Sequence, residues 1–171
     1  MILLTEMPAE ACDRKEFGFK RTVCGCQECS RNCLFIPGYL IPADLQRLLP
    51  TDASKSEWAE KYLRASPGGL VLYQGKAFRI PTIVPARKDN GSCVFHSEGN
   101  CTVHRVSPFG CAFFDNHMSD EEGDIRTRMG LASILEGFQS GYGELWRHLW
   151  EKNLRVPGPE ESRARMERAA A

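Results

Sequence analysis

The sequence predicts a small α+β domain that is mostly helical, with one or two short β-hairpins and a cysteine-rich loop region. Apolar residues recur at three- and four-residue intervals over about 120–155, which is the period of an amphipathic helix. Two pairs of short apolar runs, near 70–80 and near 93–104, each enclose turn-forming residues, as β-hairpins do. These two patterns together indicate the α+β class.

The length of the chain is that of one domain. With 171 residues, of which 42% are hydrophobic, it can bury a single core, and we assign that domain to residues 1–156. A charged, alanine-rich tail follows over 157–171, and we expect it to be loose. We expect residues up to about Thr22 to be irregular, with Phe17 and Phe19 holding them against the core.

The first half of the domain is predicted to hold a loop and two helices. Residues 24–33 are assigned to a loop, because their glycine, serine and asparagine favour turns over a helix interior. Pro42 suits the first turn of a short helix over 43–49. A second helix is expected to begin near 52–54 and to end at the Ser-Pro-Gly-Gly run 66–69.

Two hairpins are expected next. The first joins the apolar runs 70–73 and 78–80. The second joins 93–96 to 101–104 through a Ser-Glu-Gly-Asn turn, so that cysteines lie on both of its arms. The hairpins therefore account for the β part of the fold.

The remaining chain is predicted to be helical. Ser107 and Pro108 resemble an N-cap and a first helical position, which would place Cys111 in a first turn, where the helix dipole favours a thiolate. The main helical region over about 120–155 begins with three acidic residues and contains glycines that weaken its centre. Its apolar positions, which we assign to the core, are Leu131, Ile134, Leu135, Phe138, Tyr142, Leu145, Trp146 and Leu149.

Charge and hydropathy exclude several classes of partner. The 22 basic and 22 acidic residues balance, so nothing indicates electrostatic binding to nucleic acid or to an anionic membrane. The first residues have no basic flank and too short an apolar run for a signal peptide, and no apolar stretch approaches the roughly 18 residues of a membrane span. We therefore expect a cytoplasmic protein with no membrane and no nucleic-acid partner.

Seven of the eight cysteines fall into two groups, and Cys12 stands apart. Clustered cysteines in a reduced compartment are more often metal ligands or redox groups than disulfides, although an even number leaves a disulfide framework as the alternative. Thiolates that converge on one point bind a soft cation or an iron–sulfur cluster. The predicted metal ligands are Cys24, Cys26, Cys29 and Cys33 in segment 24–33, and Cys93, Cys101 and Cys111 in segment 93–111.

The spacing within the first group favours iron–sulfur. Cys26-x2-Cys29-x3-Cys33 is similar to the end of a bacterial ferredoxin motif, although Cys24 is one residue too close and Leu34 stands where proline is usual. A structural zinc site would more typically show two separated cysteine pairs with two to four intervening residues. The second group has gaps of seven and nine residues instead.

The order of these cysteines and their aromatic neighbours resembles the YkgJ-like cysteine-cluster proteins, a family described as zinc- or iron-chelating and named for a CxxCxxCC signature. Cys26-x2-Cys29 matches the opening of that signature, and Cys33 matches one of its last cysteines. The later segment matches through Cys93-Val-Phe, Cys101-Thr-Val-His, Pro108 and Cys111-Ala-Phe-Phe. The resemblance covers residues 22–115 and implies a metal site, for which we expect a [4Fe-4S] cluster.

The chain departs from the family pattern at several positions. The adjacent Cys-Cys pair is absent because Asn32 precedes Cys33, and Cys24 compensates from the other side. His104 stands where the family has tyrosine, and Val106-Ser107 interrupts its Arg-Pro pairing. The resemblance implies a metal site, but it does not imply a particular reaction.

Three functions remain open on the sequence. The first is an iron–sulfur protein, with a [4Fe-4S] cluster and a redox, electron-transfer or cluster-dependent role. The second is a zinc-stabilised module that binds a partner, and the third is a metal chelator or carrier. One site could take four cysteines and leave three for a second site or for the surroundings of the first. Alternatively, three cysteines could hold a cluster with one open iron, which would take a substrate or a fourth ligand such as His96, His104 or His117. We prefer one cluster fed by both cysteine groups.

Whether the protein is an enzyme stays open. No acid–base pair or nucleophile dyad stands out, so any activity, such as that of an iron–sulfur oxidoreductase, would be centred on the metal. The expected partner is an unidentified redox or client protein.

Overall fold

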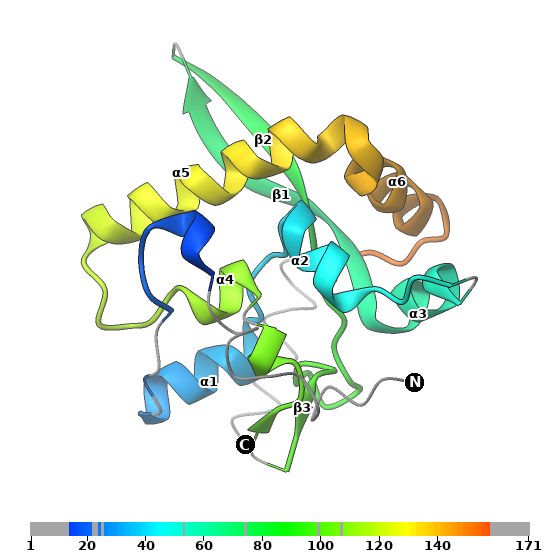
Figure 1. Ribbon diagram of the computed structural model, residues 1–171, viewed down its shortest axis with the longest axis horizontal. Helices are drawn as coiled ribbons and strands as arrows, with labels where there is room; N and C mark the ends of the chain where they lie inside the picture. The colour runs from blue at the N-terminus through cyan, green and yellow to red at the C-terminus, as the bar shows by residue number, and fades with distance from the viewer. Residues whose placement is uncertain are drawn as a thin grey trace.

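The computed structural model describes residues 14–21, 24, 26–52, 54–73, 75–98, 100–106 and 108–157 (Figure 1). The α+β class is confirmed. The predicted tail beyond Pro157, the N-cap at Ser107 and Cys12 lie outside the described residues. In chain order the elements are η3 (Lys15–Phe17), α1 (Gln27–Phe35), α2 (Pro42–Leu48), α3 (Lys55–Tyr62), β1 (Leu63–Tyr73), β2 (Lys76–Pro85), β3 (His96–Ser97), β4 (Asn100–Cys101), η4 (His104–Val106), α4 (Phe109–Ala112), α5 (Asp120–Gly137), η5 (Phe138–Tyr142) and α6 (Gly143–Glu151).

Most of the elements gather in two parts of the molecule, with α2 and α3 outside them (Figure 1). The long helix α5, the β1–β2 ribbon and α6 lie on one side, and α1, α4 and the small β3–β4 hairpin lie on the other (Figure 1). The two cysteine segments belong to this second part, which brings α1 close to the hairpin although they are far apart in sequence.

The antiparallel β1–β2 ribbon is longer than the hairpin predicted from sequence. The Ser-Pro-Gly-Gly run 66–69, expected to end a helix, lies within β1, and the register shifts between Ser66 and Gly69. Gly68 has a φ of +88°, and a Cβ there would stand 1.7 Å from the Ile80 oxygen. The glycine therefore serves a bulge in a strand, a role that the local sequence does not distinguish from a helix end.

The predicted helical region over 120–155 is confirmed as α5 and α6, joined by the bend η5, but Leu135, which was assigned to the core, is 57% exposed. Gly141, with a φ of +95°, takes the conformation that this bend requires. The bend directs the Tyr142 hydroxyl into the core, where it donates to the Leu40 carbonyl at 2.7 Å and accepts from the Ile83 N–H at 2.8 Å. The glycines thus divide the helix at a defined point.

An aromatic cluster joins the N-terminal segment to α4. Phe17 is buried, and its ring centroid lies 4.7 Å from that of Phe109 and 5.1 Å from that of Phe113. Phe19 packs on the same two rings, with Arg126 of α5 stacked over it at 4.3 Å. The prediction that Phe17 and Phe19 hold this segment against the core is confirmed.

Asp44 is the most buried carboxylate that the structure describes, and it joins three segments. Its side chain accepts from the backbone N–H of Ile41 at 2.9 Å, which caps α2, and from the N–H of Phe109 at 2.9 Å, which begins α4. Arg14, only 2% exposed, donates to it at 2.7 Å. A short helix near 43–49 was predicted, but this polar contact to α4 was not.

The loop predicted for residues 24–33 is wrong from residue 27 onward. Residues 27–35 form α1, and the Cys26 sulfur caps it by accepting from the Cys29 N–H at 3.5 Å. None of its residues is buried. The serine and asparagine tolerate a helix here because they lie on its exposed side, where local turn preference counts for little.

In the part of the chain that the structure describes, no helix is both long enough and apolar enough to cross a membrane.

Candidate metal centre

Four side chains converge at the N-terminus of α1. The sulfurs of Cys24, Cys26 and Cys29 and a ring nitrogen of His117 all lie within 4.8 Å of one another. Cys24 precedes α1, Cys26 is its N-cap and Cys29 lies in its first turn, whereas His117 comes from the turn between α4 and α5. Among the described residues, this is the group of potential ligands that comes closest together, and its thiolate and imidazole donors suit a metal ion.

Cys26 and His117 are in direct contact, and each shifts the pKa of the other. The Cys26 sulfur lies 3.3 Å from the Nε2 atom of His117. The Cys29 backbone N–H and the His117 ring lower the pKa of Cys26 to about 6, and the Cys26 thiolate in turn raises the pKa of His117. The thiolate needed to bind metal is therefore present near neutral pH.

Cys29 is held by the turn that carries the histidine. The Asn116 N–H donates to the Cys29 sulfur at 3.4 Å and lowers its pKa, but desolvation and the nearby Cys26 and Cys24 raise that pKa to about 11. Asn32 of α1 donates to the Asn116 side chain at 2.6 Å. A cation in the group would remove the repulsion among the sulfurs.

Asn116 and Asp115 are residues that sequence analysis missed. Asp115 accepts from the His117 N–H at 2.9 Å and so sets the turn on which the histidine lies. The Asp-Asn-His run is a turn signal in the sequence, but its link to Cys29 depends on the tertiary fold.

The remaining four clustered cysteines lie farther inside. Cys33 is in the last turn of α1, and Cys101 is its direct hydrogen-bond partner, which lowers the pKa of Cys33 to about 7. Cys93 and Cys111 lie close enough to Cys33 for their charges to interact with it. The structure therefore divides the seven predicted ligands into an outer group, defined as Cys24, Cys26 and Cys29 with His117, and an inner group, defined as Cys33, Cys93, Cys101 and Cys111.

One cavity of about 380 Å³ connects the two groups. Its lining includes Cys24 and Cys29 from the outer group and Cys33, Cys101 and Cys111 from the inner group. His96 and His104, the other predicted histidines, also line this cavity but do not belong to the compact outer group. His148, by contrast, lies far from the cysteines in the fold and pairs with Glu60 at 2.8 Å.

The helix dipole does not govern Cys111 as the sequence predicted. The residue lies in α4, as expected, but this helix is only four residues long. Desolvation and the neighbouring Cys93 raise the pKa of Cys111. Burial therefore favours the thiol in the metal-free protein, against the prediction of a thiolate.

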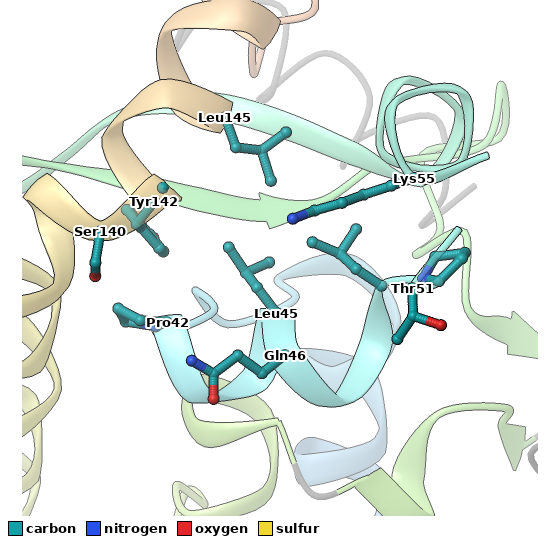
Figure 2. Close-up of a pocket in the computed structure, with 11 residues that line it drawn as sticks. Pro42, Leu45, Gln46, Thr51, Lys55, Ser140, Tyr142 and Leu145 are labelled. Atoms are coloured by element: carbon teal, nitrogen blue, oxygen red, sulfur yellow. The ribbon is translucent and has the colours of Figure 1, made fainter. Parts of the chain in front are cut away.

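A second pocket, of about 350 Å³, lies between α2 and the start of α6 (Figure 2). Its lining residues are mostly apolar and include no cysteine, histidine or carboxylate. The Ser140 hydroxyl at its edge donates to the Gly137 carbonyl at 2.9 Å. The lining offers no ligand set for a metal, so we place the candidate site at the cysteines.

Comparison of the chain with models of protein families, with curated proteins and with solved structures finds no match. The metal centre therefore rests on the cysteine geometry, which is consistent with metal binding in general.

Proposed function

We propose that the protein is a zinc-binding protein in which the outer group holds one tetrahedral ion. The observation that carries this proposal is the compactness of the four donors, which lie within 4.8 Å. Zn–S bonds of about 2.3 Å in tetrahedral geometry place two sulfurs roughly 3.8 Å apart, so the donors need only a small contraction. Three cysteines and one histidine are also a common structural zinc set.

The ion would stabilise the arrangement of α1 in this proposal. Cys26 and Cys29 belong to the start of the helix, and His117 belongs to a turn about ninety residues later. Because α1 has no buried residue, the free energy of metal binding would replace the packing that other helices have. We infer a module stabilised by zinc whose work is to bind a protein partner in the reducing cytoplasm.

An iron–sulfur cluster is the second candidate, and the shared cavity favours it. Five of the seven clustered cysteines line one space of about 380 Å³, as a [4Fe-4S] cluster fed by both segments would require. The resemblance to the YkgJ-like family supports membership in that family but fits either metal. A redox or electron-transfer role would follow from the cluster.

Metal analysis of the full chain, purified without oxygen, tests the proposal. We expect about one zinc per chain, and we expect His117→Ala to lose most of it. His104→Ala is the matched control, because His104 lines the cavity outside the outer group and should leave the zinc content unchanged. Equal zinc in both variants and in the wild type would contradict the assignment.

Cobalt substitution gives a second reading of the same site. We expect Co²⁺ to produce visible bands of a tetrahedral thiolate site in the wild type and weaker, shifted bands in His117→Ala. A weak chelator then separates a structural ion from a carried one, since a structural ion leaves only as the protein unfolds. Release of the ion from a protein that stays folded would favour the carrier role.

A further inference from the structure

We propose that the inner group, Cys33, Cys93, Cys101 and Cys111, forms a second and separate metal centre that takes an iron–sulfur cluster. Each cysteine comes from a different part of the fold: the end of α1, the segment before β3, the strand β4 and the helix α4. This inference goes beyond the zinc site and does not require zinc there.

The backbone brings these four segments to one place. The Cys93 N–H donates to the Leu34 carbonyl at 2.7 Å, which joins the segment before β3 to the end of α1, next to Cys33. Cys101 pairs with His96 across the β3–β4 hairpin, which follows Cys93 directly. The convergence therefore depends on main-chain contacts as well as on side chains.

Cys111 is positioned by a close backbone approach. The Gly110 N–H donates to the Tyr39 carbonyl at 3.1 Å, and the Cys111 sulfur lies 3.8 Å from the Gly38 oxygen. A Cβ on Gly110 would stand 2.4 Å from the Tyr39 oxygen, and one on Gly38 would stand 1.8 Å from the Gly110 oxygen. Two glycines thus let α4 carry its cysteine against the segment that follows α1.

The inner sulfurs are surrounded by groups that suit bound thiolates. The sulfur of Cys93 lies near the backbone N–H groups of Phe95 and His96, and the sulfur of Cys101 lies near that of Val103. The His96 N–H also donates to the Cys93 carbonyl at 3.0 Å. Backbone N–H groups that donate to ligand sulfurs are a regular part of thiolate metal sites, because they offset negative charge and orient the ligand.

The spread of the inner sulfurs distinguishes this site from the outer one. Among the described residues, no three of the four have all their sulfurs within 4.8 Å of one another, unlike the outer group. A single zinc ion would draw its sulfurs to roughly 3.8 Å, whereas a cluster core stands between its ligands. Binding a core would part Cys33 and Cys101, which are hydrogen-bonded to each other, but it suits the wider spread of the group as a whole. Cys33, Cys101 and Cys111 face the cavity of about 380 Å³ that Cys24 and Cys29 also line, and this cavity provides room for such a core. Cys93 is not one of its lining residues and would join the core from the buried side.

The test counts iron, acid-labile sulfide and zinc on one sample of the full chain, reconstituted without oxygen from ferric iron, sulfide and dithiothreitol, which reduces half of the iron. We expect about four iron and four sulfide per chain, with a visible charge-transfer band, in addition to zinc. Iron without sulfide, or a second zinc in place of iron, would overturn the inference. A disulfide between Cys33 and Cys101 in protein kept free of oxygen would overturn it as well.

Two variants separate this inference from the zinc proposal. Cys26→Ser belongs to the outer group and should lose zinc but keep iron and sulfide, whereas Cys101→Ser should lose iron and sulfide but keep zinc. Zinc retained in Cys101→Ser also shows that this variant still folds. Loss of iron from both variants would indicate one shared cluster and refute a separate inner site. If the wild type contains no zinc, and iron is lost in Cys101→Ser but kept in Cys26→Ser, only the zinc proposal is refuted.

Discussion

Removing the Asp44 carboxylate should destabilise the whole fold. The side chain is fully buried and accepts from Arg14 at 2.7 Å and from the N–H groups of Ile41 and Phe109 at 2.9 Å each. Breaking a buried ion pair by deleting one partner costs about 3–5 kcal/mol, and each hydrogen bond to a charged group contributes about 1.5–3 kcal/mol. These terms overlap, so we expect Asp44→Ala to lower the free energy of unfolding by about 4 kcal/mol.

The loss should be visible in both denaturant and thermal unfolding. For a chain of this size, about 4 kcal/mol corresponds to a fall in Tm of roughly 8–16 °C. Urea titrations followed by tryptophan fluorescence, with all samples at the same metal concentration, measure it. Asp44→Asn keeps the volume and should lose less, because its amide oxygen still accepts.

Asp89→Ala is the matched control. Asp89 is exposed, and its loss should change the free energy of unfolding by no more than about 0.5 kcal/mol. If the free energy of unfolding of Asp44→Ala lies within about 1 kcal/mol of the wild-type value, the Asp44 contacts do not organise α2 and α4, and the prediction is refuted.

Three further predictions concern the sites and the core. In metal-free protein, alkylation of Cys26 should have its midpoint near pH 6 and slow below it as the thiol gains its proton, and His117→Ala should move that midpoint upward. Fragment-ion mass spectrometry of the tryptic peptide 22–31 measures this, because fragmentation distinguishes alkylated Cys26 from Cys24 and Cys29 in the same peptide, and a midpoint at the ordinary thiol value would contradict it. Gly110→Ala should lower the free energy of unfolding by about 1–3 kcal/mol and reduce iron binding, because its Cβ would meet a backbone oxygen at 2.4 Å. Gly123→Ala in α5, with no neighbour closer than 4.0 Å, should instead stabilise the protein by about 0.5–1 kcal/mol in the same urea titration. Tyr142→Phe should cost about 1–3 kcal/mol by leaving its two buried backbone partners unpaired, and an unchanged urea midpoint would refute that role.

The sequence predicts those parts of the fold that depend on local pattern. The helices near 43–49 and 120–155 have caps and a regular apolar period, and both are present. The run 66–69 and the segment 24–33 were assigned wrongly because bulge and helix-end glycines look alike and because Cys26, an unusual cap, begins α1. In both cases tertiary contacts override a local preference.

The sequence predicted which residues form the candidate site better than it predicted which of them lie together. The cysteines and His117 were all named from sequence, but spacing placed Cys33 with its neighbours Cys26 and Cys29. In the structure Cys33 lies two turns along α1 and meets Cys101 instead. Because the sequence analysis assigned 24–33 to a loop, it could not show that a helix carries Cys33 away from Cys26 and Cys29.

The position of α1 couples the two proposed centres. The helix has no buried residue, yet its N-cap is Cys26, its first turn carries Cys29 and its last turn carries Cys33. Occupation of the outer centre would fix the helix and so place one ligand of the inner centre in advance. Linkage makes this effect reciprocal, so each metal would raise the affinity for the other by the same factor. A single exposed helix of nine residues would thus make loading of the protein cooperative.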